Sequence, residues 1–210
     1  MTTDPIIYVV DDDADVRDSM RALLGSAGFR VKDYSSARAF LDDRDSRSGC
    51  LIADVQMPDM DGMELLEQIA IRGPGLPVIV MTGHGDVPLA VRAMKAGAVD
   101  FIEKPFAEAV LLQSIERALA VGQSARNRAE EAKAADALLA LLTPREYQVL
   151  NQIVIGRSNK IAAFELGISH RTIEIHRAHI MDKMNARSLS DLVRIALASG
   201  SSALAIVKAA

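Results

Sequence analysis

Short apolar runs alternate with longer amphipathic stretches over the first part of the chain. Within the longer stretches, apolar residues recur every three or four positions, as Val16, Met20 and Leu23 do, and this is the spacing of a helix with one buried face. The runs have the length of strands and occupy residues 6–10, 29–34, 50–54, 78–82 and 99–103. Strands that alternate with helices predict an α/β fold with a doubly wound, five-stranded parallel sheet.

A purely helical pattern follows the last strand. The final helix of the first domain is expected at residues 106–121. Residues 123–142 are rich in Ala, Glu, Arg and Lys and contain no Pro, so we expect a continuous or nearly continuous helical linker, with Gly122 as its break. The pattern thus divides the chain into a first domain (1–122), a linker (123–142) and a second domain (143–210).

The second domain shows no strand pattern and predicts an all-α domain of four helices. Thr143 stands where the first helix needs an N-cap, and Glu146 follows three residues later, as in a capping box. Gly167 ends the second helix, which covers residues 159–166, and Ser169 caps the third. The fourth helix is expected at residues 188–198.

Polar residues follow several strands of the predicted sheet. Asp11, Asp12 and Asp13 come after the first strand, Asp54 and Thr82 end two others, and Lys104 follows the last. The carboxyl ends of parallel strands meet at one edge of a sheet. Clustered carboxylates repel unless they bind a cation or take up a proton. The pattern therefore predicts a Mg²⁺ and phosphoryl site, with Asp13 as a solvated or capping residue and not a ligand.

Composition limits the class of protein. The 210 residues, half of them apolar, suffice for two domains with separate cores. No apolar run approaches the roughly 20 residues that span a bilayer. The N-terminus has no signal-peptide pattern, so we expect a cytoplasmic protein without a membrane partner. Cys50 is the only cysteine, which excludes an internal disulfide and a Cys-rich zinc site, and we expect it to be buried in a strand.

Charge is divided unevenly along the chain. Residues 1–122 contain 12 Lys and Arg against 20 Asp and Glu, a net charge of −8. Residues 143–210 contain 9 against 5, a net charge of +4. An acidic half joined to a basic half predicts separate roles, with the basic half facing a polyanion.

The spacing of the Asp pair, Asp54, Thr82 and Lys104 with Pro105 resembles the receiver domain of two-component response regulators, over residues 5–121. The resemblance implies a flavodoxin-like sheet of order 2-1-3-4-5, with Asp54 accepting a phosphoryl group from a sensor histidine kinase. It implies that Mg²⁺ is held by Asp11, Asp12, Asp54 and the backbone carbonyl of Gln56. It also implies a switch and phosphate-binding set of Thr82, Phe101, Lys104 and a cis Pro105.

Residues 159–174 have helix–turn–helix form, with a short helix, a Gly-containing turn and a capped second helix. The segment 143–199 resembles the LuxR/FixJ-type DNA-binding domain, although Tyr147 departs mildly from its pattern. A recognition helix at residues 171–184 would enter the major groove and bury a face that includes His176. Residues expected at base edges are Arg171, Thr172, Glu174 and Arg177. Residues expected at phosphates are Ser158, Asn159, Lys160 and Lys183.

Two points stay open in this half. Glu174 can accept a hydrogen bond from cytosine, or it can instead orient Arg177. The basic face can also belong to a four-helix module that binds proteins. His176, by its helical spacing, is expected to be a packed residue and not a base contact. His84, two residues after Thr82 in the first domain, is expected to shape its loop and to have no catalytic role.

Across both halves the chain resembles the FixJ subfamily, in the runs 81–91 and 94–106 and at 176–178. The resemblance implies a FixL-like sensor histidine kinase, promoter DNA and RNA polymerase as partners, control of nitrogen-fixation or low-oxygen genes, and a homodimer formed through the phosphorylated receiver. Candidate dimer residues are Val91, Met94 and Val110 to Leu112, with core burial an equal alternative for Val91 and Leu111.

Other classes fit less well. An aspartate-nucleophile phosphatase needs a second Asp two residues after the nucleophile, where this chain has Gln56. No Ser-His-Asp, Walker or Rossmann glycine pattern occurs, so we expect no enzyme and no catalytic residue. Sustained turnover of a phosphoester would support an enzyme. Salt-dependent binding to duplex DNA would dismiss a phospho-regulated interaction module or an RNA-binding antiterminator.

Overall fold

The computed structural model describes residues 5–43, 48–72, 75–83 and 87–199. The chain divides into two compact units, residues 1–126 and 127–210. This division falls inside the predicted linker, and the domain boundaries predicted at residues 122 and 143 stay predictions. Among the described helices, none is long and apolar enough to cross a membrane.

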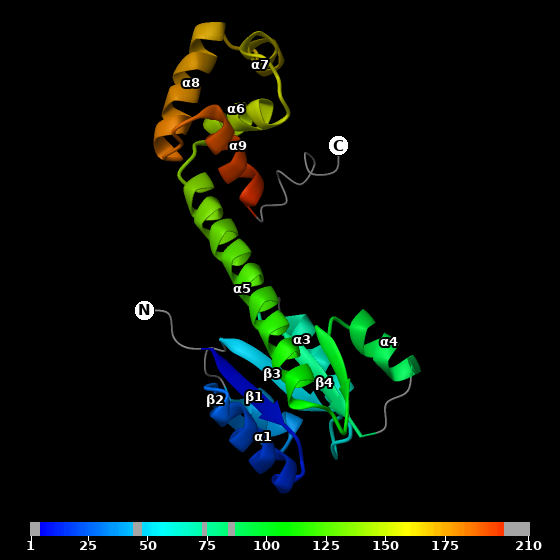
Figure 1. Cartoon of the computed structure of the whole chain (residues 1–210). Helices are drawn as coiled ribbons and strands as arrows, with labels where there is room; N and C mark the ends of the chain where they lie inside the picture. Colours follow the sequence, from blue (N-terminus) through cyan, green and yellow to red (C-terminus); the bar gives the residue numbers. More distant parts are fainter. Residues whose placement is uncertain (1–4, 44–47, 73–74, 84–86, 200–210) are drawn as a thin grey trace. The chain divides into compact units, whose positions relative to one another are not determined.

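The first unit is built on a five-stranded, all-parallel sheet in the predicted order β2-β1-β3-β4-β5 (Figure 1). The strands are β1 (Ile6–Val10), β2 (Arg30–Tyr34), β3 (Gly49–Asp54), β4 (Val78–Thr82) and β5 (Asp100–Glu103). The helices are α1 (Ala14–Ser26), α2 (Ala37–Asp42), α3 (Gly62–Arg72), α4 (Val87–Lys95) and the first part of α5 (Glu108–Leu139).

Helices cover both faces of the sheet, so the first unit has two apolar layers. Ile7 and Val9 of β1 pack with α1 and α5, whereas Tyr8 and Val10 pack with α2, α3 and α4. This alternation follows from the two-residue period of a strand. Strands β3 and β4 are buried along their whole length, which fixes the residues at their carboxyl ends.

Cys50 lies in β3 with no exposed surface, as predicted. Burial raises the pKa of its thiol to about 12, because the apolar surroundings disfavour the thiolate. The thiol is therefore neutral and unreactive at physiological pH.

Helix α5 does not break at Gly122, and that prediction was wrong. The helix continues from Glu108 to Leu139. A Cβ atom at Gly122 would lie only 2.9 Å from Pro77 Cδ, so the glycine permits close packing of α5 against the chain before β4. That packing, with strong helix formers on both sides, offsets the roughly 1 kcal/mol by which glycine disfavours a helix.

The second unit contains the four helices predicted for the second domain, namely α6 (Pro144–Val154), α7 (Asn159–Leu166), α8 (His170–Lys183) and α9 (Leu189–Ala198). They surround one apolar core, which includes Leu150, Ile173 and Ile180. Thr143 and Glu146 form the predicted capping box at the start of α6. Helix α8 begins and ends one residue earlier than predicted.

Candidate functional site

Three of the predicted strand-end residues meet at the carboxyl edge of the sheet. Lys104, just after β5, donates hydrogen bonds from Nζ to Asp11 Oδ2 (2.9 Å) and to Asp54 Oδ1 (2.6 Å). Asp11 follows β1 and Asp54 ends β3, so residues far apart in sequence are joined by parallel strands that stop at one edge. The centre of the site is an ammonium group between two carboxylates.

The two carboxylates are almost fully enclosed, with 2% of Asp11 and 5% of Asp54 exposed. Burial raises the pKa of Asp54, although the hydrogen bond from Lys104 acts in the opposite direction. Burial also acts to lower the pKa of Lys104, but its bonds to Asp54 and Asp11 outweigh this and raise it. Lys104 therefore stays charged, and it compensates the negative charge of the pocket.

Backbone N–H groups donate hydrogen bonds to the other oxygen of each carboxylate. The N–H of Gln56 donates to Asp54 Oδ2 (2.7 Å), and the N–H of Asp13 donates to Asp11 Oδ1 (2.9 Å). The side chain of Gln56 is exposed. These bonds fix the orientation of both carboxylates before any ligand binds.

The predicted switch residues lie on neighbouring strands. Thr82 ends β4 and is fully buried, and Phe101 in β5 is half-buried against the core that α2, α3 and α4 cover. Phe101 pairs with Val80 in the register of β4 and β5, so Phe101 and Thr82 face the same side of the sheet. The peptide bond between Lys104 and Pro105 is cis.

Asp12 and Asp13 differ in their surroundings, although both are exposed. Asp13 is the N-cap of α1, and its side chain accepts hydrogen bonds from the N–H groups of Asp15 (2.8 Å) and Val16 (3.4 Å). The capping role predicted for Asp13 is confirmed. Asp12 stands at the edge of the pocket, where its carboxylate is open to solvent.

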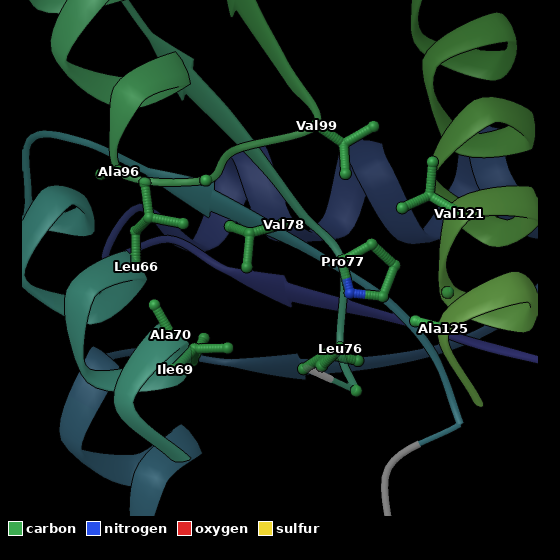
Figure 2. A pocket seen from close by; sticks show the side chains of 13 residues that line it. Leu66, Ile69, Ala70, Leu76, Pro77, Val78, Ala96, Val99, Val121 and Ala125 are labelled. Carbon is green, nitrogen blue, oxygen red and sulfur yellow. The ribbon is translucent and has the colours of Figure 1, made fainter. Parts of the chain in front are cut away.

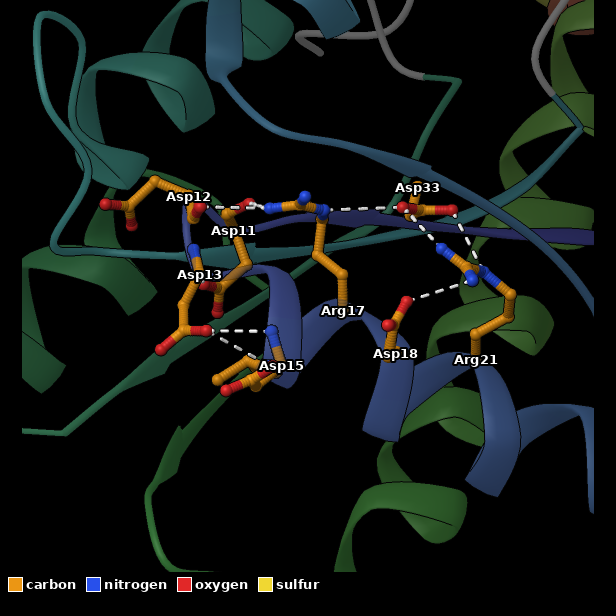
Figure 3. A network of polar contacts seen from close by, with 9 residues as sticks. Asp11, Asp12, Asp13, Asp15, Arg17, Asp18, Arg21 and Asp33 are labelled. Carbon is orange, nitrogen blue, oxygen red and sulfur yellow. Dashed lines mark hydrogen bonds and ion pairs between the residues drawn. The ribbon is translucent and has the colours of Figure 1, made fainter.

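Arg17 holds the acidic loop, a role that was not predicted from the sequence. Its Nη1 donates to the backbone carbonyls of Asp11 (2.8 Å) and Asp12 (3.0 Å), while its Nε lies 3.4 Å from Asp33 Oδ2 (Figure 3). Arg21 completes the network from the next turn of α1 with a second bond to Asp33 (3.0 Å). The available signal was a pair of arginines four residues apart directly after an acidic run.

The donor set of the pocket fits Mg²⁺, because carboxylates and a backbone carbonyl are the hard oxygen ligands that this ion prefers. The predicted ligands Asp11, Asp12, Asp54 and Gln56 all lie along this edge of the sheet. Within the described residues no group of three or more His, Cys, Asp and Glu side chains is placed to hold a metal ion. Lys104 lies between two of the carboxylates, so a bound cation would share them with its ammonium group.

A helix–turn–helix arrangement forms in the second unit. The Ser158 side chain caps α7, and Gly167 ends that helix in the left-handed conformation (φ 64°). Ser169 then caps α8, where its Oγ accepts from the N–H of Thr172 (3.0 Å). Glycine is favoured at that helix end because it has no Cβ to strain.

Two residues predicted to read base edges, Arg171 and Glu174, are exposed on α8, and Lys160 is exposed on α7. Arg177 donates from Nη1 to Asn159 Oδ1 (2.5 Å), which links α8 to the first residue of α7. Glu174 lies 3.5 Å from His170 and is not paired with Arg177. In this structure Asn159 orients Arg177, and both roles considered for Glu174 at the DNA stay predictions.

Lys183, predicted to contact phosphate, is half-buried and is paired with a buried glutamate. Its Nζ donates to Glu146 Oε2 (2.7 Å), and only 4% of Glu146 is exposed. The hydrogen bond from Lys183, with another from the N–H of Thr143, lowers the pKa of Glu146 to about 2. The pair fastens the end of α8 to the start of α6. The Lys183 side chain is still 34% exposed, and its contact with phosphate stays a prediction.

The two remaining histidine predictions have different outcomes. His176 is half-buried on α8, and its Nδ1 atom is enclosed by protein, as expected for a packed residue. His84, predicted to shape the loop after β4, lies outside the described residues.

Comparison with known proteins agrees with this two-part arrangement. Residues 7–116 match the response regulator receiver domain family, and residues 140–196 match the LuxR family of bacterial regulatory proteins. The chain is 50% identical over 95% of its length to the transcriptional regulatory protein FixJ of Bradyrhizobium diazoefficiens, 98% of which is covered. It is also 50% identical to FixJ of Rhizobium meliloti over 94% of this chain and 98% of that protein. The chain is a response regulator of the FixJ subfamily.

Solved structures of response regulators also match this FixJ-subfamily regulator over most of its length. The response regulator StyR matches with a TM-score of 0.78 at 45% identity, over 92% of this chain and 98% of StyR. Full-length FixJ from B. japonicum matches with a TM-score of 0.57 at 49% identity, over 95% and 98% of the two chains. Members of the family are transcription regulators and not enzymes. A receiver joined to a LuxR-type domain implies a kinase and DNA as partners.

Proposed function

We propose that this protein is a transcription activator controlled by phosphorylation of Asp54. The observation that supports the proposal most directly is the buried Asp54 carboxylate, held between the ammonium of Lys104 and the N–H of Gln56. A carboxylate fixed in this way is positioned for reaction, and the hydrogen-bond donors around it can stabilise a new negative charge.

The reaction is a transfer between two side chains. One carboxylate oxygen of Asp54 bonds to the phosphorus of a phosphohistidine on a FixL-like kinase, while the P–N bond breaks and the histidine keeps the electron pair. Lys104 then places its charge against the phosphoryl oxygens. Asp11, Asp12, Asp54 and the carbonyl of Gln56 would hold Mg²⁺, which neutralises charge on the transferring oxygens when it is bound.

The phosphoryl group then changes a surface of the receiver. Thr82 donates its hydroxyl to a phosphoryl oxygen, and Phe101 turns into the space that Thr82 leaves. The surface that responds includes Val91, Met94 and Val110, whose exposed fractions are 45%, 49% and 48%. Leu111 is fully buried and Leu112 half-buried, so these two belong to the core of the unit. Phosphorylation thereby favours a homodimer of receivers over the inactive form.

Dimerisation brings two copies of α8 to promoter DNA. Arg171, Thr172, Glu174 and Arg177 read base edges in the major groove, and Ser158, Asn159, Lys160 and Lys183 contact phosphates. Two half-sites about one helical turn apart match two such helices. RNA polymerase is the partner through which the bound dimer activates transcription.

Acetyl phosphate with Mg²⁺ tests this proposal on the purified full chain. We expect a mass gain of one phosphoryl group and tighter binding to promoter DNA in a mobility-shift assay. Asp54→Asn should lose both effects. Asp59→Asn, the same change at an exposed aspartate five positions later, should keep both. Normal DNA binding and activation without any mass gain would contradict the proposal.

Nitrogen-fixation or low-oxygen genes are the targets that similarity to FixJ favours. The response regulator protein TmoT of Ectopseudomonas mendocina is 44% identical over 90% of this chain and 87% of that protein, which favours another pathway as the alternative. Genome-wide footprinting of the phosphorylated protein separates the two. Occupied promoters outside nitrogen-fixation and respiratory genes would support the alternative.

A further inference from the structure

The first unit contains an apolar cavity of about 310 Å³ at the end of the sheet away from Asp54 (Figure 2). Its wall is formed by the end of α3, the chain before β4, the chain before β5 and one side of α5. Pro77 and Val99 precede the two strands, so the cavity lies at their amino ends. Its volume is within the range of small-molecule sites.

The cavity has an apolar wall and a mouth that is partly open. Every described residue that lines it is Gly, Ala, Pro, Val, Leu or Ile. Gly122 lies against Pro77 without a side chain between them. Val121, half exposed, presents apolar surface at the edge. Such a space favours an apolar ligand, because transfer of apolar surface out of water stabilises the complex.

A half-buried arginine stands beside this wall. Arg126 follows Ala125 on α5, and both Ala125 and Gly122 line the cavity. The Arg126 Nε donates to the carbonyl oxygen of Gly122 (3.4 Å). Its Nη1 donates to Ser48 Oγ (2.5 Å). Over the part of the chain that the structure describes, the guanidinium has these neutral partners and no carboxylate partner.

A half-buried cation whose described partners are all neutral is a favourable place for a negatively charged ligand group. Charged hydrogen bonds are roughly twice as strong as neutral ones, and a planar guanidinium matches a carboxylate. We propose that this site binds a small apolar carboxylic acid of about a dozen non-hydrogen atoms. Its hydrocarbon part fills the cavity and its carboxylate pairs with Arg126.

This site is separate from the phosphorylation pocket and does not depend on the function proposed for it. The ligand would contact α5 at Val121 to Ala125, in the same helix that continues to Leu139. It would also contact the chain before β4 and thereby join two elements of the first unit. The protein would then have a chemical input besides phosphorylation.

Titration of the isotope-labelled full chain with 4-phenylbutyrate tests the proposal by NMR. We expect saturable shifts in the amide signals of Gly75, Leu76, Gly97 and Gly122. The neutral analogue 4-phenyl-1-butanol has nearly the same size and should bind about tenfold more weakly, because it lacks the charged contact. Absence of saturable shifts in these signals, or equal affinity for acid and alcohol, would overturn the proposal.

Variants locate the site. Arg126→Ala should remove the preference for the acid, whereas Arg128→Ala, at an exposed position two residues further along α5, should keep it. Ala70→Phe places a ring at an exposed position of the lining and should block both ligands without overpacking the core. An unchanged thermal midpoint shows that this variant is folded. Undiminished binding of 4-phenylbutyrate by Ala70→Phe, or an unchanged preference in Arg126→Ala, would place the ligand elsewhere and refute the proposal.

Discussion

Lys104 keeps two buried carboxylates close together in the folded protein, at 2.9 Å from Asp11 and 2.6 Å from Asp54. Without the ammonium group, two negative charges would share an enclosed space. At least one carboxyl would then be expected to take up a proton in the folded state. The stability of the unphosphorylated receiver therefore depends on this one side chain.

Lys104→Met should lower the free energy of unfolding by about 3 kcal/mol at pH 7.5. The loss should shrink as the pH falls toward 5, because the carboxyls of the folded variant then bind protons that the unfolded chain does not. Urea unfolding at several pH values measures this. Lys95→Met, at an exposed position on α4, should change little. A loss of the same size at both pH values would contradict the explanation.

Gly62 is a second residue on which the pocket depends. A Cβ atom there would lie 2.1 Å from the carbonyl oxygen of Asp54, so α3 can start at this place only without a side chain. Gly62→Ala should destabilise the first unit by about 2 kcal/mol, the usual cost of overpacking, and should shift the NMR signals of Asp54 and Gln56. Gly25→Ala in α1, where a Cβ meets nothing within 4 Å, should instead be neutral or slightly stabilising.

Among the elements, α6 and α8 are joined by the pair of Glu146 and Lys183. The pKa of Glu146 is about 2 in the folded protein against an ordinary value of 4.5, so its stabilisation is complete above about pH 4.5 and is lost as the pH falls toward 2. Glu146→Gln should lower the stability of the second unit by about 2 kcal/mol at pH 7.

The difference in free energy of unfolding between the wild type and Glu146→Gln should become smaller below about pH 4.5. Urea unfolding followed through NMR signals of α6 and α8 isolates this unit from the first. Glu165→Gln, at an exposed position 3.8 Å from Arg157, is the matched control and should have little effect. If this difference in free energy of unfolding stayed constant down to pH 2, the charge of Glu146 would not be the cause of the lost stability.

Helices α7 and α8 are linked by Asn159 and Arg177. Asn159→Ala should free Arg177 and reduce the preference for operator over scrambled DNA by about tenfold. Lys160→Ala should weaken binding to both duplexes alike and reduce the salt slope by about one. Fluorescence anisotropy at several salt concentrations measures both quantities. An unchanged preference in Asn159→Ala would show that Arg177 does not depend on this link.

The sequence predicted the elements well because their signals are local. Strands β1, β3 and β4 are apolar runs, whereas β2 and β5 mix apolar and charged residues. The caps of α6, α7 and α8 are a Thr or Ser directly before a helical pattern. The strand ends then placed Asp11, Asp54 and Lys104 together, because parallel strands share an edge.

Predictions went wrong where a distant contact decides the outcome. Gly122 is a helix breaker by propensity, yet Pro77, remote in sequence, favours it inside α5. The pairing of Lys183 with Glu146, which is also remote in sequence, was not predicted. The role of Arg17 depends on where the backbone carbonyls of Asp11 and Asp12 lie. The spacing of apolar and polar residues does not predict those positions.

At the scale of the whole molecule, the function requires two copies to associate. Met94→Asp places a charge at an exposed apolar position of α4 and should prevent the dimer that acetyl phosphate induces, without reducing phosphoryl uptake. Sedimentation velocity reports the dimer and mass spectrometry the uptake. Ile71→Asp, on α3 at a position 79% exposed, is the control that should still dimerise. Dimers of Met94→Asp as strong as those of the wild type would exclude this surface.

The enclosed Cys50 thiol has a practical consequence for such work. Cys50 is the one native cysteine, and it is buried in β3. The folded protein therefore does not react with maleimides or disulfide-forming reagents. A cysteine introduced on the surface becomes a unique attachment point for a spin label, a dye or a cross-link, with no background to remove. Distances between labelled protomers, before and after addition of the phosphodonor, can thus be followed in an otherwise unmodified protein.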